Sequence, residues 1–352
     1  MNIFDLMYKQ FKFKQKEIIL FEAFSGIGSQ QKALNKLAEE YNFKLKIAGI
    51  SEIDTAAIQS YESIHGAVKN YGSITEIKTI PKVDIFTYSF PCQDISRAGK
   101  QKGFAKGSGT RSGLLWEVER ILLNQAKEEK LPKVLLMENV KALAGHNFNQ
   151  DFIDWQMQLE KLGYKNYWRI LNAKHYGVPQ TRERIIMISI QGEYSYNFPE
   201  SIPLEKDLKD YLDKEVPEKY YINQNIYDRL VVKKETNHLK VLNNTKKGYL
   251  IAEPYDGIIL NHLTGGGYKG NGARGRIQKK MAPTLLTQKE VGVIESDLRI
   301  RQLTAREKWK LMGFNDEEYN KVAAVTKETQ LLKQAGNSIV VDLLYYVFKQ
   351  LF

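Results

Sequence analysis

The feature that most constrains the fold is a regular alternation of apolar, strand-like segments with helical patterns over the first half of the chain. Strands are expected at 17–21, 44–50, 83–90, 134–137, 167–172 and 184–190, and helices at 30–41, 55–65, 114–129 and 152–162. Strands separated by helices favour parallel pairing, with helices covering both faces of the sheet. The pattern therefore predicts an α/β fold with a mostly parallel, doubly wound sheet.

The pattern changes after about Gly192, where Pro199, Pro203 and Pro217 punctuate shorter and less regular segments. Helical patterns return at 304–312 and 339–352, and the last one is apolar on one side. Such a change is typical of a domain boundary. We expect a first domain at 1–192, a smaller second domain at 193–300, and a return to the first domain at 301–352.

The charge balance favours a polyanionic partner. The 352 residues include 52 Lys and Arg against 41 Asp and Glu, a net charge of +11. Two glycine-containing stretches, 99–111 and 257–289, carry basic residues and no acidic ones. They contain Lys100, Lys102, Lys106, Arg111, Lys269, Arg274, Arg276, Lys279, Lys280 and Lys289. Because glycine lets a backbone approach phosphates closely, these stretches favour nucleic acid over a merely basic surface.

The composition also bounds where the protein works. No apolar run approaches the roughly 20 residues that a membrane span needs, and residues 1–16 lack the apolar core of a signal peptide. A single cysteine argues against a disulfide scaffold and against a cysteine-based zinc site. We expect a cytoplasmic protein with no bound metal and no membrane partner.

The one cysteine, Cys92, follows the apolar segment 83–88 in the sequence Ser-Phe-Pro-Cys-Gln-Asp. It stands at the end of a buried strand and at the start of the basic stretch 99–111. A lone thiol at this place is either a small core hydrophobe or a nucleophile. The local sequence leaves both readings open.

A second candidate site is the turn between the first strand and the first helix, Phe24-Ser25-Gly26-Ile27-Gly28. Glycines there let the backbone approach a ligand at the helix N-terminus, although a tight turn alone would explain them. Glu52 ends the second strand, where a carboxylate commonly accepts hydrogen bonds from ribose hydroxyls. Together these residues indicate an adenosine-containing cofactor, either a nicotinamide nucleotide or S-adenosylmethionine.

Polar residues beside two further strands complete the candidate set. Glu138 follows the strand 134–137, where a carboxylate either caps the structure or binds a ligand. Arg182 and Arg184 precede or begin another strand, and their spacing of two predicts guanidinium groups on one face. They form either surface ion pairs or an anion-binding pair.

Taken together, these segments resemble the DNA (cytosine-5) methyltransferase family, in that family's order and over nearly the whole chain. The motifs are Phe24–Gly28, Glu52, Gly72-Ser73-Ile74, Phe90-Pro91-Cys92-Gln93, Glu138-Asn139-Val140, Gln180 with Arg182 and Arg184, Arg276-Ile277 with Pro283-Thr284, and Gly336-Asn337-Ser338. The segment 111–117 is also similar to the loop-to-helix segment of mollicute-type CG methyltransferases. That similarity concerns the scaffold and does not establish the recognised sequence.

The resemblance implies a Rossmann-like, S-adenosylmethionine-dependent methyltransferase sheet with a smaller target-recognition domain. Cys92 would add to C6 of a flipped-out cytosine, Glu138 would hold the base, and Arg184, supported by Arg182, would contact the base or nearby backbone. S-adenosylmethionine, converted to S-adenosylhomocysteine, would be held by Phe24, Gly26, Gly28, Glu52, Ile53, Ser73, Ile74, Pro91, Leu114, Asn337 and Ser338. Double-stranded DNA would contact Gln93, Ser96, Lys100, Lys102, Arg111, Arg274, Arg276 and Thr284. We expect a monomer, with a companion restriction endonuclease as a candidate partner.

Two positions depart from the family pattern. Ser73 stands where an Asp often contacts the adenine amino group, and Ile53 stands where an aromatic residue often stacks on the cofactor. Three alternatives remain: an RNA cytosine-5 methyltransferase on the same scaffold, a catalytically silent DNA-binding relative, and a dinucleotide oxidoreductase. The last would leave Cys92, Glu138 and the closing motif unexplained.

Overall fold

The computed structural model describes residues 9–95, 103–243, 245–260, 276–287 and 291–352. The chain divides into two compact units. Unit 1 consists of Met1–Leu171, Glu183–Glu200 and Leu343–Phe352, and unit 2 consists of Asn172–Arg182 and Ser201–Asp342. The segment 301–342, which the sequence assigns to the first domain, therefore clusters with unit 2, and only the end of the chain joins unit 1. Which segments bind cofactor and which recognise DNA stays a prediction.

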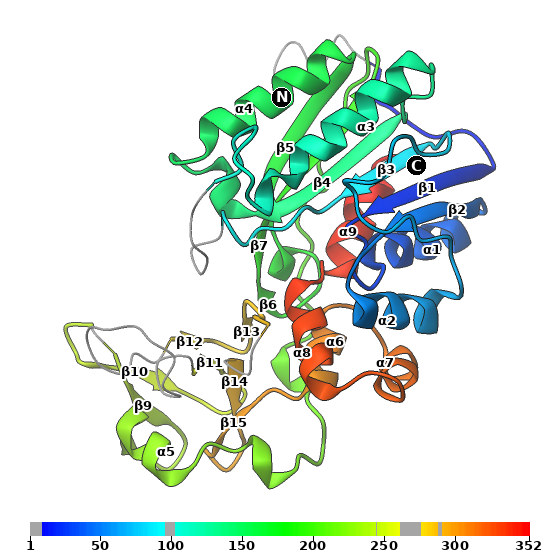
Figure 1. Ribbon diagram of the computed structural model, residues 1–352. Coiled ribbons are helices and arrows are strands. Elements are labelled where there is room, and N and C mark those ends of the chain that lie inside the picture. The colour runs from blue at the N-terminus through cyan, green and yellow to red at the C-terminus, as the bar shows by residue number, and fades with distance from the viewer. Residues whose placement is uncertain (1–8, 96–102, 244, 261–275, 288–290) are drawn as a thin grey trace. The chain divides into compact units, whose positions relative to one another are not determined.

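Unit 1 is built on a six-stranded sheet with the order β2-β1-β3-β4-β7-β5 (Figure 1). The strands are β1 (Glu17–Ala23), β2 (Lys44–Ser51), β3 (Ile85–Tyr88), β4 (Val134–Val140), β5 (Tyr164–Asn172) and β7 (Glu183–Gln191). β1 pairs in parallel with β2 and β3, and β3 in parallel with β4, whereas β7 runs antiparallel to β4. The mostly parallel α/β sheet is confirmed.

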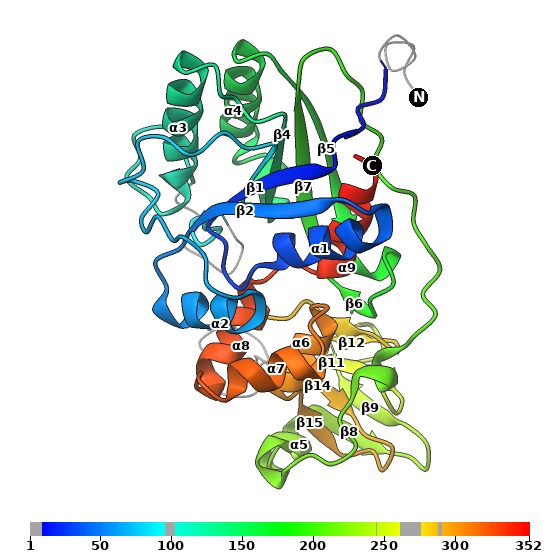
Figure 2. The same ribbon diagram turned by 90° about the vertical axis from the view of Figure 1, so that its right-hand side faces the viewer.

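Helices cover both faces of this sheet. α3 (Leu115–Lys127) and α4 (Asn149–Lys161) lie on one face, and α1 (Ser29–Tyr41) and α9 (Val341–Lys349) on the other (Figures 1 and 2). Val118, Ile121 and Leu122 of α3 pack with Trp155 of α4 against the strands, because their spacing places them on one side of each helix. Among the described helices, none is long and apolar enough to cross a membrane.

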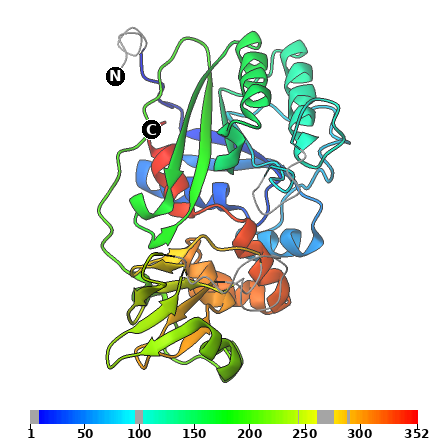
Figure 3. The same cartoon turned by 90° about the vertical axis from the view of Figure 1, so that its left-hand side faces the viewer.

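The end of the chain closes unit 1. Phe13 N–H donates to the carbonyl of Leu351 at 2.7 Å, so the red C-terminal end lies beside the dark blue first segment in Figure 3. Lys349 of α9 also pairs with Glu40 of α1 at 2.7 Å. The apolar side that the sequence indicates for the last helix is thus packed within unit 1, where Leu344, Val347 and Phe348 are fully buried.

Several strand boundaries differ from the sequence expectation, and two of them bear on the candidate site. β3 ends at Tyr88 rather than at residue 90, since Pro91 lacks the N–H that would continue a ladder. β4 runs on to Val140, because β7 pairs with it from Val134 opposite Ile190 to Val140 opposite Arg184. Glu138 and Asn139 are therefore strand residues, held more rigidly than residues of a loop.

Unit 2 is made of small sheets and short helices. A three-stranded sheet has the order β10-β9-β8, a four-stranded sheet the order β12-β11-β14-β15, and β13 pairs in parallel with β6. The strands are β6 (Gln180–Thr181), β8 (Val231–Lys234), β9 (Leu239–Leu242), β10 (Tyr249–Ala252), β11 (Gly257–Ile259), β12 (Ile277–Gln278), β13 (Ala282–Pro283), β14 (Val291–Ile294) and β15 (Ile300–Gln302). The helices are α5 (Gln224–Leu230), α6 (Ala305–Leu311), α7 (Asp316–Ala323) and α8 (Glu328–Asn337).

Buried charge holds part of unit 2 together. Arg301 of β15 is fully buried, and its guanidinium meets both carboxylate oxygens of Glu307 at 2.8 and 2.9 Å. Glu307 also accepts from the Thr304 N–H as part of a capping box that begins α6. Since both charges are paired and hydrogen-bonded, this internal position is tolerated.

Candidate active site

The sequence-predicted residues of unit 1 gather where the parallel strands end. In the order β2-β1-β3-β4, the chain places β2 on one side of β1 and then β3 on the other side. The strand order therefore reverses between β1 and β3. Ligands of open α/β sheets bind outside the carboxyl ends of the strands at such a point. Phe24–Gly28 follow β1, Pro91 and Cys92 follow β3, and Glu138 lies near the end of β4. The topology thus brings the two sequence-predicted sites to one edge.

The glycine turn after β1 has a specialised backbone. Phe24, Gly26 and Gly28 all have positive φ angles, of 56, 56 and 78°. A side chain at Gly26 would meet open space, whereas one at Gly28 would collide with His65 and Tyr61. Gly28 is therefore needed for packing, and Gly26 leaves room for a ligand to approach the backbone. Phe24 is not a glycine and therefore adopts this conformation at an energetic cost. Such strained residues are common beside functional sites.

Glu52 ties the glycine turn to the end of β2. One carboxylate oxygen accepts from Gly26 N–H at 2.9 Å, and the other accepts from the N–H groups of Ile53 and Asp54 at 2.8 and 2.9 Å. Asn70 brackets the Glu52 backbone, with bonds of 3.2 and 3.0 Å to its N–H and carbonyl. A carboxylate has lone pairs for further donors, so this geometry can still receive ribose hydroxyls.

The residues around Glu52 fit an adenosine-containing cofactor. The Ile53 side chain is 71% exposed, an unusual position for a large apolar group beside a polar turn. Ser25 Oγ is buried and has no hydrogen-bond partner among the described residues. Ser73 Oγ pairs with the Thr75 hydroxyl at 2.7 Å, and the Ile74 side chain lies in the core. An apolar platform and an unsatisfied hydroxyl are features that a bound ring and a polar tail would complete.

Glu138 and Arg184 form an ion pair on neighbouring strands. Arg184 Nε lies 3.0 Å from Glu138 Oε1, and both side chains are largely buried. The pairing of β4 with β7 brings them together, since Val140 stands opposite Arg184 and Glu138 opposite Ile186. Asn139 donates to the carbonyl of Phe90 at 3.0 Å, which links the end of β4 to the segment that carries Cys92.

Cys92 stands at the head of a turn and is half-buried. The N–H of Ile95 donates to the carbonyl of Cys92 at 3.0 Å. Leu114, of the short 3-10 helix Ser112–Leu114, packs partly buried against the core, and the Pro91 carbonyl accepts from the Ser112 hydroxyl at 2.6 Å. Cys92 is therefore not a fully buried core residue, and its role as nucleophile stays a prediction.

Arg182 and Arg184, for which the spacing predicts one shared face, have different partners. Arg182 lies between β6 and β7, is 2% exposed, and its guanidinium donates to the carbonyls of Leu285, Gly336 and Ser338 at 2.9, 2.8 and 2.7 Å. The strand is interrupted there, because the Arg182 N–H bonds back to the Gln180 carbonyl. Within unit 2, Arg182 therefore holds the segment of Asn337 and Ser338 against the chain after β13.

The closing motif lies at the end of α8. Asn337 is exposed and Ser338 is nearly buried. A side chain at Gly336 would lie 2.5 Å from the backbone of Leu286 and Thr287, so glycine is needed for this close approach. The cofactor contacts that the resemblance assigns to Asn337 and Ser338 stay predictions.

The candidate DNA-contacting residues are described only in part. Gln93, Arg111 and Arg276 are exposed, and Thr284 Oγ1 donates to the Thr181 carbonyl at 2.5 Å. Ser96, Lys100, Lys102 and Arg274 lie outside the described residues. Lys106, one of the basic residues of 99–111, pairs with the buried Glu119 at 2.5 Å. Its charge is therefore partly neutralised within unit 1.

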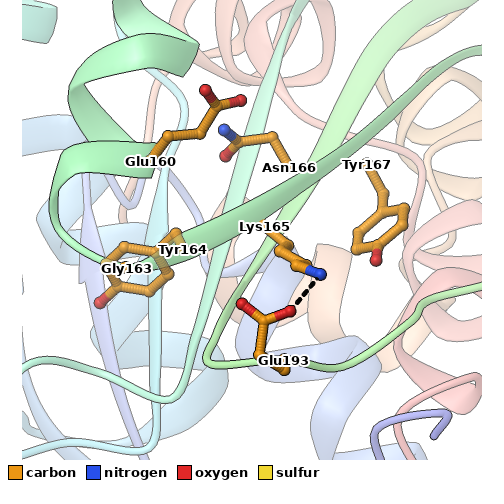
Figure 4. A pocket seen from close by; sticks show the side chains of 7 residues that line it. All are labelled: Glu160, Gly163, Tyr164, Lys165, Asn166, Tyr167 and Glu193. Carbon is orange, nitrogen blue, oxygen red and sulfur yellow. Dashed lines mark ion pairs between the residues drawn. The ribbon is translucent and has the colours of Figure 1, made fainter. Parts of the chain in front are cut away.

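A pocket of about 420 Å³ lies elsewhere in unit 1, at the junction of α4 and β5 (Figure 4). It is lined by Glu160, Gly163, Tyr164, Lys165, Asn166, Tyr167 and Glu193. Lys165 and Glu193 face each other across it in an ion pair of 2.5 Å. Among the residues that the structure describes, none of the predicted site residues lines this pocket.

Sequence reasoning missed three buried polar groups near the site. Glu22 of β1 is fully buried and accepts from Tyr61 OH at 2.7 Å and from Gln31 N–H at 3.1 Å. Asp94 and Ser112 are buried beside Cys92. The sequence offers two signals, since Asp94 stands two residues after Cys92 and Glu22 is a charged residue within an apolar strand. Neither signal identifies the group to which the side chain bonds.

Comparisons with known proteins show the family to which the chain belongs. The model of the C-5 cytosine-specific DNA methylase family matches residues 18–352. Type II methyltransferase M2.ScrFI of Lactococcus lactis subsp. cremoris is 35% identical, over 95% of this chain and 98% of the relative. Orphan methyltransferase M.SssI of Spiroplasma monobiae is 31% identical, over 94% of this chain and 96% of the relative.

Solved structures share the fold. The Dnmt2 methyltransferase of S. pombe superposes with a TM-score of 0.61 at 18% identity, over 95% of this chain and 98% of its own. A DNMT2 mutant of Spodoptera frugiperda gives 0.65 at 16% identity, over 95% and 99%. With the family match and the 31–35% identical relatives, the chain belongs to the C-5 cytosine-specific DNA methylase family and is a DNA (cytosine-5) methyltransferase.

Proposed function

We propose that the protein methylates C5 of a cytosine flipped out of duplex DNA, with Cys92 as nucleophile and S-adenosylmethionine as methyl donor. The observation that supports this proposal most directly is that β3 and β4 are parallel neighbours in the sheet. Cys92 follows the end of β3, and Glu138 lies near the same end of β4. The Arg184 guanidinium, 3.0 Å from Glu138, fixes that carboxylate. A thiol and an oriented carboxylate supply a nucleophile and a partner for a polar ring.

The proposed reaction begins with addition of the Cys92 thiolate to C6 of cytosine. The S–C6 bond forms, and the electrons of the C5–C6 double bond move through the ring, so that C5 becomes nucleophilic. With a proton on its carboxyl group, Glu138 donates to N3 and accepts from the exocyclic amino group, and so stabilises the negative charge that develops in the ring. S-adenosylmethionine, when bound, supplies the electrophilic methyl group that C5 takes up. Loss of the C5 proton to solvent and expulsion of the Cys92 thiolate then restore the ring as 5-methylcytosine.

The cofactor would be held by the glycine turn and by the end of β2. Gly26 leaves space beside its backbone, Glu52 is oriented by three N–H groups, and Ile53 offers an exposed apolar surface to the adenine ring. These features support the assignment of S-adenosylmethionine to this part of unit 1. Asn337 and Ser338 are proposed as further contacts from the family resemblance.

The proposed partner is double-stranded DNA. C5 lies inside the base stack, so the cytosine must leave the duplex at a cost of a few kcal/mol. The net charge of +11 and the exposed Arg111 and Arg276 support contact with phosphates or base edges. Some relatives are named type II and others orphan, so a companion restriction endonuclease remains a proposal for genetics to test.

The deciding experiment is trapping with duplex DNA that contains 5-fluorocytosine. Fluorine cannot leave as a proton does, so a covalent adduct at Cys92 should accumulate and be located by peptide mass spectrometry. Cys92→Ala should form no adduct and transfer no methyl group while still binding DNA. Absence of the adduct with saturating S-adenosylmethionine, or methylation by Cys92→Ala, would refute the mechanism.

The substrate class is tested separately. Labelled methyl transfer into duplex DNA should exceed transfer into transfer RNA, and bisulfite sequencing of a methylated plasmid would give the recognised sequence. Preferential labelling of RNA would instead support an RNA cytosine-5 methyltransferase. DNA binding without any transfer would support the catalytically silent alternative.

A further inference from the structure

The turn that carries Cys92 is held by hydrogen bonds from both sides. The Ser112 hydroxyl donates to the Pro91 carbonyl at 2.6 Å, and it accepts from the Asp94 N–H at 3.3 Å. Pro91 precedes Cys92, and Asp94 comes two residues after it. One hydroxyl group therefore bridges the backbone on the two sides of the nucleophile.

The bridge is reciprocal. Oδ2 of Asp94 accepts from the N–H groups of Arg111 and Ser112 at 3.0 and 3.4 Å, at the start of the 3-10 helix that leads into α3. Asp94 is 5% exposed and Ser112 is fully buried. Each residue thus uses its side chain to bind the other's segment, and burial removes the competition from water that weakens such bonds on a surface.

Further contacts join the same two segments. Gly103 N–H donates to the Asp94 carbonyl at 2.9 Å, and Thr110 Oγ1 donates to the Gly103 carbonyl at 2.9 Å. The Trp116 indole N–H of α3 donates to the Phe104 carbonyl at 2.6 Å. The Cys92 turn is therefore fastened to the beginning of α3, a helix that is itself packed in the core.

We propose that Asp94 and Ser112 are positioning residues that fix the Cys92 sulfur for attack by holding its turn on α3. The proposal rests on the proposed role of Cys92 as nucleophile. Neither side chain needs to touch the substrate; their effect passes through the backbone on each side of Cys92. A misplacement of about 1 Å at a reacting group can lower a rate by about 100-fold, so a loosened turn should act mainly on kcat.

The first test compares Ser112→Ala with Ser189→Ala. Ser189 of β7 is also fully buried, and its hydroxyl donates to Asn166 Oδ1 at 2.7 Å, far along the sheet from the Cys92 turn. Ser112→Ala should lower kcat by about 10- to 100-fold, while KM for S-adenosylmethionine and DNA affinity change by less than about threefold. Ser189→Ala should leave kcat within about twofold of the original protein, since it disturbs only packing remote from the thiol.

The second test needs no substrate, because Cys92 is the chain's one cysteine. Alkylation by iodoacetamide, followed by mass spectrometry over a range of pH, reports on this sulfur alone. Ser112→Ala should be alkylated several-fold faster, since opening of the turn exposes a half-buried sulfur. Asp94→Asn keeps an acceptor oxygen, so it should fall between the original protein and Asp94→Ala in both kcat and alkylation rate.

The outcomes separate the two proposals. If the original protein forms no adduct with 5-fluorocytosine DNA, the proposed function fails, and the alkylation series still decides whether the turn is held. If Ser112→Ala and both Asp94 variants are folded by circular dichroism and match Ser189→Ala in alkylation and kcat, the positioning role is refuted. If Ser112→Ala does not fold, the ordering of Asp94→Asn and Asp94→Ala carries the same decision.

Discussion

Replacing Glu22 with glutamine should remove most of the dependence of folding stability on pH that arises between about pH 5 and pH 8 in unit 1. Burial raises the pKa of the Glu22 carboxyl to about 7 in the folded protein. The Tyr61 hydroxyl faces oxygens of both Glu22 and Gln31. The Tyr61 hydroxyl has one proton and can donate it to only one of these two oxygens. When it donates to Gln31, a protonated Glu22 carboxyl can donate to the Tyr61 oxygen, so that both contacts are hydrogen bonds. Glutamine mimics this neutral form of the side chain.

The magnitude follows from the difference between the folded and unfolded pKa values. From about pH 4.5 to about pH 7 the folded state retains a proton that the unfolded state has released, so stability falls as pH rises. A difference of about 2.5 pKa units corresponds to a loss of about 3 kcal/mol, complete above pH 7. Glu22→Gln has no such proton to lose, so its stability should change less between pH 5 and pH 8.

The assay is urea unfolding of Glu22→Gln and the original protein at pH 5 and pH 8, followed by tryptophan fluorescence. For each protein, the change in the free energy of unfolding between pH 5 and pH 8 is measured. The contributions of the other titrating groups cancel when the change in one protein is subtracted from the change in the other. Glu39→Gln, an exposed change on α1, should behave as the original protein does. A difference below about 1 kcal/mol would mean that Glu22 is ionised in the folded state and would refute the reasoning.

Two further predictions concern the cofactor platform and the closing motif. Ile53→Ala should leave the melting temperature unchanged, since the side chain is 71% exposed, but should weaken S-adenosylmethionine binding by about tenfold in calorimetry through lost apolar contact. Equal affinity would rule out Ile53 as the adenine platform. Gly336→Ala should lower stability by about 1–3 kcal/mol in denaturant unfolding, because a Cβ would lie 2.5 Å from the backbone of Leu286 and Thr287. An unchanged or raised midpoint would show that the gain in helix propensity outweighs this close approach.

Much of unit 1 and its site could be predicted from local sequence. The apolar periodicity located β1, α1, β2, α2 (Thr55–His65), β4 and α4 to within a few residues, because one segment's pattern reports its own burial. Strand ends followed by Phe24–Gly28, Cys92 and Glu138 then placed these groups at one edge, since parallel strands share a carboxyl end. The order of the motifs added the family, which the family model confirms.

What the sequence by itself determined was therefore the alternation of elements, the family and the placing of the candidate site residues beside the ends of the strands. Only the tertiary structure decided the partners: Arg182 holds carbonyls 103 to 156 positions away, Lys106 pairs with Glu119, and Ser112 bridges the backbone around Cys92. The reason is physical. A periodic pattern reports which face of an element is buried, but a polar group's partner depends on which distant backbone packing brings within about 3 Å.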